Sequence, residues 1–89
     1  MKNKLTIDDV KGVITQEEYV FKGTLTLCIL TLKNGFFVTS ESACLDINNY
    51  DQEIGKKIAF ERALNKIWEL EGYLLKQRLF ELRLTGDNK

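Results

Sequence analysis

The chain of 89 residues contains no histidine and no proline, and it has two cysteines. Without histidine it lacks the commonest metal ligand and the commonest general base of enzymes. Two cysteines, Cys28 and Cys44, cannot form a disulfide framework or a zinc site built from closely spaced ligand pairs. We therefore expect no metal site, no cofactor and no enzymatic activity, and we expect both thiols to be reduced.

An excess of charge of either sign is also missing, since 13 Lys and Arg residues balance 13 Asp and Glu residues. A protein that binds nucleic acid through its phosphates needs a basic patch or stripe. Aromatic side chains on the expected sheet could stack bases, but core packing explains them more simply. Nucleic acid is therefore not an expected partner.

Long apolar runs are absent as well. The most apolar stretch, residues 25–32, is interrupted by Thr26 and Thr31 and is too short to span a bilayer. The first residues form no apolar run of signal-peptide length. We expect a cytoplasmic protein that does not enter the membrane.

The first half of the chain predicts a short helix followed by a β-meander. Thr6 is a suitable helix cap, and apolar residues at helical spacing extend the predicted helix over residues 1–15. Residues 17–40 predict a three-stranded antiparallel sheet, whose central strand would be covered on both faces in its second half. Asn34-Gly35 predicts a tight type I′ hairpin turn.

The second half predicts a polar loop and then a long helical region over residues 50–84, with Asn48 or Asn49 as its cap. From Ala59 to Leu70 the apolar residues share one helical face. That phase is lost at Glu71-Gly72, which predicts that the helix bends or breaks there. The expected fold is a single small α+β domain over residues 1–89.

Beyond this break, Leu75, Leu79 and Leu82 form a new apolar stripe with charged neighbours. Such a stripe suits a partner helix from a second copy. A domain of this size has a marginal core, so association would add stability. We therefore expect a homo-oligomer that associates through these three leucines.

Few residues could carry chemistry. Cys44 has no histidine to activate it, so a small residue that closes a loop is the simpler interpretation. Glu71 lies on the apolar side of the helix and needs a partner. It either holds the loop of residues 40–44 or an arginine, or it lines a ligand pocket. Glu41, Ser42 and Tyr73 complete the structural or ligand-contact candidates.

Four segments carry a resemblance to a known family. They are Asn34-Gly35-Phe36, Glu41-Ser42-Ala43-Cys44, Tyr50-Asp51-Gln52-Glu53-Ile54-Gly55 and Ile67-Trp68-Glu69-Leu70-Glu71-Gly72-Tyr73-Leu74-Leu75. In this order the chain, over about residues 30–79, resembles the gene-49/gene-66 family of small tailed-phage and prophage accessory proteins. It departs from the family at Ser40, where glycine is usual, and at Glu69, where proline is often found.

The resemblance implies a phage or prophage origin and expression in the bacterial cytoplasm, and it supplies no catalytic residues. Our leading hypothesis is a non-enzymatic accessory protein that self-associates and binds a host protein to modulate or inhibit a host process. The alternative is a protein that binds or sequesters a small ligand, such as a nucleotide signal, between subunits through Glu41, Ser42 and Glu71. A third reading, a cysteine-dependent enzyme, predicts fast alkylation of Cys44.

Overall fold

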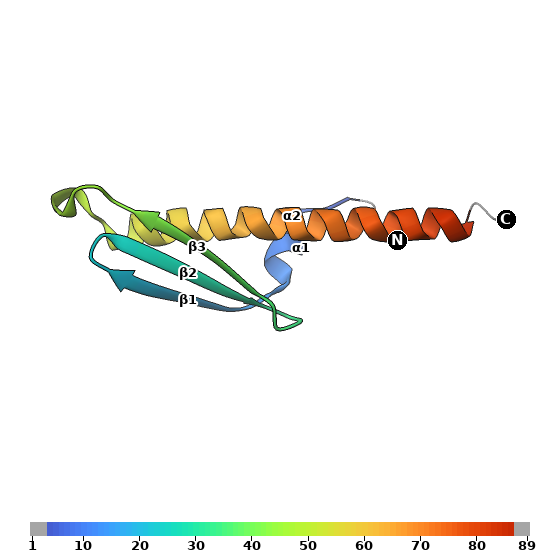
Figure 1. Ribbon diagram of the computed structural model, residues 1–89, viewed down its shortest axis with the longest axis horizontal. Helices are drawn as coiled ribbons and strands as arrows, with labels where there is room; N and C mark the ends of the chain where they lie inside the picture. Colours follow the sequence, from blue (N-terminus) through green and yellow to red (C-terminus); the bar gives the residue numbers. More distant parts are fainter. Residues whose placement is uncertain (1–3, 87–89) are drawn as a thin grey trace.

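The computed structural model describes residues 4–86, with side chains for residues 4–83. It confirms an α+β fold in which three antiparallel strands, in the order β1-β2-β3, lie beneath one long helix (Figure 1). In chain order the elements are α1 (Ile7–Gly12), β1 (Ile14–Lys22), β2 (Leu25–Leu32), β3 (Phe37–Ala43), the short 3₁₀ helix η1 (Ile47–Asn49) and α2 (Gln52–Gly86).

The first helix is shorter than predicted. Thr6 caps it in a reciprocal capping box, in which the backbone N–H of Thr6 donates to Asp9 Oδ2 at 2.9 Å and the Asp9 N–H donates to Thr6 Oγ1 at 3.2 Å. The predicted end near Thr15 is wrong, because α1 ends at Gly12 and β1 begins at Ile14. Glycine is a poor helix former, and the β-branched residues that follow it favour a strand.

The two hairpin turns both use glycine, but the second is not the predicted type I′ turn. Within the described residues only glycines have positive φ, 57° at Gly23 and 87° at Gly35, so Asn34 does not. The Gly35 N–H donates to the Leu32 carbonyl at 2.9 Å, and Asn34 Oδ1 accepts from the Phe36 N–H at 3.0 Å. This is a three-residue connection with a left-handed glycine, which is also common in hairpins.

Helix α2 covers one face of the sheet, over β2 and β3, and leaves the other face open. On β2 the side chains of Thr26, Cys28, Leu30 and Leu32 are buried against the helix layer, whereas the alternate residues are only half-buried. The prediction that the second half of β2 is covered on both faces is therefore wrong, since within residues 4–86 no second layer lies on the open face. The core consists of Val10, Cys28, Leu30, Leu32, Val38, Ala59, Ala63, Leu64 and Ile67.

Helix α2 is continuous, so the predicted bend or break at Glu71-Gly72 is wrong. It runs as one α-helix of 35 residues, and Figure 1 shows no kink. A single glycine costs a helix only about 1 kcal/mol, and Glu69 keeps the N–H that a proline would remove. The change of apolar phase follows a change of neighbour, because the residues of α2 that are buried on the sheet end at Ile67 and the helix then also passes α1.

The chain between β3 and α2 is more ordered than the predicted polar loop. Strand β3 continues to Ala43, and Asp46 caps η1 by accepting the Asn48 N–H at 2.9 Å. The predicted caps of the long helix, Asn48 and Asn49, lie in η1 instead. Asp51 takes that role, and its Oδ1 accepts the Glu53 N–H at 2.9 Å.

The first turns of α2 lie directly against β2 at Gly55. A Cβ atom at Gly55 would lie 2.6 Å from Thr26 Oγ1, a distance that real Cβ atoms do not show. The buried Thr26 hydroxyl in turn shares a hydrogen bond of 2.9 Å with the Tyr50 hydroxyl. Glycine therefore sets the distance between helix and sheet, and the threonine–tyrosine bond satisfies the buried hydroxyl.

We predict that Gly55→Ala lowers the free energy of unfolding by roughly 1–3 kcal/mol, because Thr26 is β-branched and cannot turn away from the new methyl group without strain. The matched control is Gly72→Ala in the same helix, where nothing lies within 4 Å of the added Cβ. It should raise stability by up to about 1 kcal/mol. Urea denaturation followed by circular dichroism measures both, and equal stability of the two variants would contradict the close approach.

Candidate functional site

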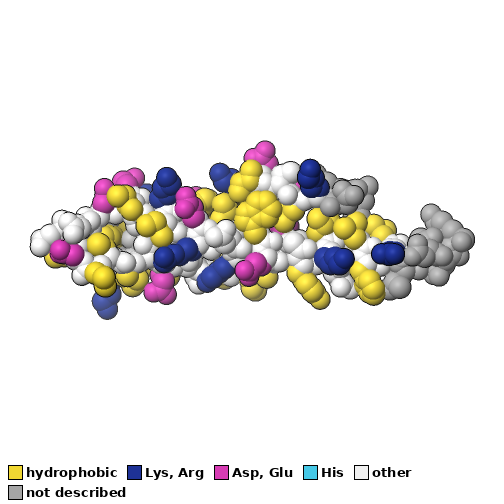
Figure 2. All heavy atoms as spheres, turned by 90° about the horizontal axis from the view of Figure 1, so that it is seen from above, with side chains coloured by type: hydrophobic (Ala, Val, Ile, Leu, Met, Phe, Trp, Pro, Cys, Tyr) yellow, Lys and Arg dark blue, Asp and Glu magenta, His cyan; other side chains and the backbone are white. Residues whose placement is uncertain are grey.

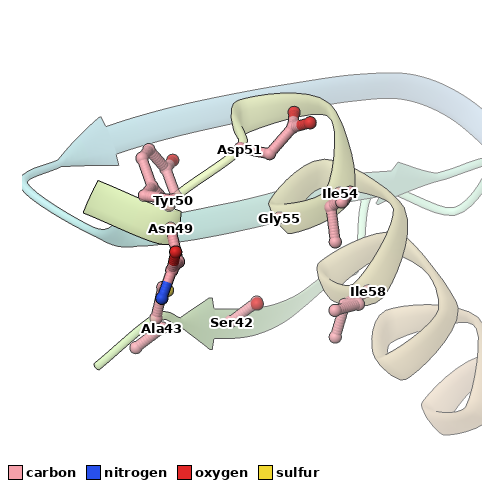
Figure 3. A pocket seen from close by; sticks show the side chains of 9 residues that line it. Ser42, Ala43, Asn49, Tyr50, Asp51, Ile54, Gly55 and Ile58 are labelled. Carbon is pink, nitrogen blue, oxygen red and sulfur yellow. The ribbon is translucent and has the colours of Figure 1, made fainter. Parts of the chain in front are cut away.

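A shallow hollow opens where β3 ends and α2 begins (Figure 3). It has a volume of about 200 Å³ and is partly open to solvent. Its lining residues are Ser42, Ala43, Cys44, Asn49, Tyr50, Asp51, Ile54, Gly55 and Ile58. We call it the Cys44 pocket.

Local structure explains how each polar group reaches the Cys44 pocket. Ser42 is buried because it lies on the face of β3 that α2 covers. Cys44 follows the end of β3, and its thiol donates to the Asp46 carbonyl at 3.2 Å. Tyr50 is oriented by its hydrogen bond to Thr26.

The Cys44 pocket contains few ionisable side chains. Among the described lining residues Asp51 alone is ionisable to a carboxylate, and it is already engaged as the cap of α2. The Cys44 thiol hydrogen-bonds a backbone carbonyl, which is no base for activating a nucleophile. The described part of the chain also contains no group of three or more Cys, Asp or Glu side chains that could hold a metal ion.

Glu71 lies in a different place from the Cys44 pocket. It follows Gly55 by 16 residues in the continuous helix, which corresponds to about 24 Å along the axis. It lines a hollow of about 210 Å³ together with Lys4, Leu5, Asp9, Leu75 and Arg78. The expectation that Glu71 holds the loop of residues 40–44 is therefore wrong, because a straight helix carries it to the other end of the sheet.

The remaining candidates, Tyr73 and Glu41, do not line the Cys44 pocket. Tyr73 is 72% exposed on α2, and the exposed Glu41 lies on the open face of the sheet, opposite the face that buries Ser42. The backbone carbonyl of Glu41 accepts a hydrogen bond of 2.8 Å from Arg62. Of the five predicted residues the structure thus brings together Ser42 and Cys44 only.

Three residues that shape the Cys44 pocket were not singled out individually from the sequence: Thr26, Tyr50 and Gly55. Tyr50 and Gly55 stand in one of the segments that carry the family resemblance. Thr26 interrupts an apolar strand, and a buried hydroxyl needs a hydrogen-bond partner. The need for such a partner is the feature of the sequence that could have identified Thr26.

The second cysteine, Cys28, is buried and lies opposite the half-buried Tyr19 across β1 and β2, so the two form a separate pair of titratable groups. Burial raises the pKa of the Cys28 thiol. Burial, followed by the hydrogen bond to Glu17, raises the pKa of the Tyr19 hydroxyl. Both groups therefore stay neutral at physiological pH and serve the core; Lys56 also places its ammonium 5.0 Å from the centre of the Tyr19 ring.

Exposed apolar side chains gather at the opposite end of the sheet from the Cys44 pocket. A groove of about 430 Å³ lies between the start of β3 and α2, lined by Phe36, Phe37, Val38, Thr39, Lys66, Glu69 and Leu70. Phe36 and Phe37 are 55% and 62% exposed. Figure 2 shows hydrophobic side chains gathered in the middle of one long face and further ones along the distal part of α2.

Comparison with known proteins gives one match. The sequence pattern of the phage protein (N4 Gp49/phage Sf6 gene 66) family matches residues 5–79 of this chain. Neither the curated proteins nor the solved structures contain a match. No helix within residues 4–86 has an apolar stretch of the length that crossing a membrane requires.

The two cysteines test whether the Cys44 pocket is catalytic. We predict that iodoacetamide at neutral pH modifies Cys44 at the rate of an ordinary partly exposed thiol, because no base activates it. Cys28 should react only on unfolding, since it is fully buried and its pKa is raised. Mass spectrometry of the time course measures both rates, and Cys44→Ser is the control that isolates Cys28. Fast alkylation of Cys44 would support the cysteine-enzyme reading.

Proposed function

The chain belongs to the phage protein (N4 Gp49/phage Sf6 gene 66) family, and from this premise we propose that it acts by binding proteins rather than by catalysis. Family membership supports a phage-encoded accessory protein. Its proposed partners are further copies of itself and a protein of the bacterial host, whose activity it would modulate or inhibit in the cytoplasm.

The observation that carries the proposal is the length of α2 relative to the sheet. A helix of 35 residues is about 52 Å long, whereas the longest strand, with nine residues, spans only about 30 Å. The distal part of α2 therefore extends beyond the sheet with Tyr73, Phe80 and Leu82 at 72%, 52% and 49% exposure. Tyr73 and Phe80 share one side of this helix, and Leu82 lies on the other side with the leucine stripe. Exposed apolar patches typically mark surfaces that bind other proteins.

The leucine stripe on this distal part supports self-association. Leu82 is half-exposed, and Leu75 and Leu79 are partly buried. Leu75 shares its hollow with Leu5 of the segment before α1. A helix from a second copy would thus meet Leu79 and Leu82 directly and would meet Leu75 at the border with this segment.

The open face of the sheet supports binding of a second protein. Leu27 and Ile29 of β2 are half-buried there with no layer above them, and Phe37 of β3 lies on the same face at 62% exposure. A sheet face of this kind normally packs on another layer. We assign it to the host partner.

The Cys44 pocket still supports the small-ligand alternative, but with a different set of contact residues. Ser42 lines this pocket, whereas Glu41 and Glu71 do not. A ligand would therefore contact Ser42, Cys44 and Tyr50 in place of the predicted set.

We predict that Leu75→Lys/Leu79→Lys lowers the mass of the oligomer by removing association through the leucine stripe, because two buried charges would replace the apolar contact. Light scattering after gel filtration measures the mass, and circular dichroism checks that the variant is folded. The matched control is Leu70→Lys, which is 45% exposed and lines the groove with Phe36 and Phe37 rather than the leucine stripe. An unchanged mass of the folded double variant would contradict self-association through this stripe.

A capture experiment from host lysate separates the protein partner from the ligand. Tagged wild-type protein, Ile29→Asp and Ile54→Lys are compared by mass spectrometry of bound proteins and small molecules. Ile29 lies on the open face, and Ile54 is 57% exposed at the Cys44 pocket. We expect a host protein that Ile29→Asp loses and Ile54→Lys keeps. A small molecule lost with Ile54→Lys alone would favour the ligand alternative.

A further inference from the structure

The two edges of the sheet differ in how they are covered. On β3 the carbonyl of Glu41 accepts from Arg62 at 2.8 Å and the carbonyl of Thr39 accepts from Lys66 at 2.6 Å. Alternate residues of an edge strand direct their carbonyls away from the sheet, and Arg62 and Lys66 are one turn apart on α2. The helix therefore occupies acceptors that an added strand would need.

In the part of the chain that the structure describes, no helix side chain bonds to the backbone of β1 in this way. Figure 1 shows β1 as the strand farthest from α2, and Val20 and Phe21 on it are 50% and 38% exposed. Lys22 and Leu25 flank the two-residue turn and therefore bond to each other across the hairpin. By alternation along the ladder, the N–H and C=O groups of Tyr19 and Phe21 point away from the sheet.

The sequence along this edge is complementary to itself when it is read in the opposite direction. Its residues are Glu18-Tyr19-Val20-Phe21-Lys22. Suppose that a second β1 strand runs antiparallel beside the first, with the two Val20 residues opposite each other. The partner's Lys22 then lies opposite Glu18, and the partner's Phe21 lies opposite Tyr19. Opposite charges and aromatic pairs at directly opposed positions both stabilise antiparallel strands.

We propose that two copies of the chain pair antiparallel along β1, about a two-fold axis through Val20. The pairing places Tyr19 and the partner's Phe21 at hydrogen-bonded positions, which agrees with the outward direction of their backbone groups. The axis is perpendicular to the sheet, so both α2 helices lie on the same face of a joined sheet. The open faces of the two sheets likewise lie together on the other side of the joined sheet.

Charge selects this alignment over its neighbours. Because the outward groups alternate, strands can slide only so that Tyr19 and Phe21 keep hydrogen-bonded positions. In one neighbouring alignment Glu18 lies opposite the partner's Val20, and in the other Lys22 lies opposite the partner's Val20, so neither of them places opposite charges at these positions. Only the alignment centred on Val20 gives two ion pairs.

This surface is separate from the leucine stripe on α2. Failure of the Leu75→Lys/Leu79→Lys test therefore leaves the β1 pairing standing, and the reverse also holds. Each surface has its own variants, so the two results are distinguishable.

The first test exchanges the charges. In sedimentation velocity over a range of concentrations, Glu18→Lys and Lys22→Glu should each weaken the dimer roughly tenfold, because each places like charges opposite one another at two symmetric positions. The double variant restores opposite charges and should return to near the wild-type dissociation constant. A double variant no better than the single variants, or a wild type that stays monomeric throughout, overturns the proposal.

The second test fixes the alignment covalently. In a Cys44→Ser background, Val20→Cys places two thiols on the two-fold axis at a non-hydrogen-bonded position, where opposed Cα atoms lie about 4.5 Å apart, within reach of a disulfide. Mild oxidation should give a linked dimer on a non-reducing gel. Thr39→Cys, exposed on the same open face but on β3, is the matched control. Equal cross-linking of both variants overturns the proposal.

Discussion

The close approach of α2 to β2 at Gly55 is the contact on which the rest of the structure depends. With no side chain at this position, the first turns of the helix lie on Thr26, and Tyr50 completes the hydrogen bonding of the buried hydroxyl. This contact fixes the height and direction of a helix that then runs straight for 35 residues. The Cys44 pocket, the cover over the edge of β3 and the position of the distal leucines all follow from it.

One helix can cover only part of a three-stranded sheet, and the unequal cover separates structural from interactive surfaces. Beneath α2 lie the buried residues of β2 and β3 together with Ser42. Outside its cover remain the second face of the sheet, strand β1 and the distal turns of the helix itself. Each of these places presents apolar groups to solvent. Figure 2 shows part of them, along one long face of the molecule.

The sequence predicted the fold class, the order of the strands and the Thr6 cap because these depend on local patterns of spacing and capping. It did not predict the continuity of α2. The change of phase at Glu71 looked like a bend, but its cause is a long-range contact with α1, which no local pattern contains. For the same reason it could not place Glu71 far from Cys44 or identify Thr26 as the partner of Tyr50. The turn at Asn34-Gly35 was located correctly, but its type was not. A glycine with positive φ occurs both in a type I′ turn and in a three-residue connection, so the sequence did not distinguish them.

The hydrogen bonds from basic side chains of α2 to the carbonyls of β3 also limit how many chains strand pairing could join. A sheet with two available edges can add chains without end and grow into a fibre. Here Arg62 and Lys66 close one edge. Pairing along the other edge is symmetric and consumes the same edge on both chains, so strand addition terminates at two copies. The chain can thereby carry an open strand without growing into a fibre by strand addition.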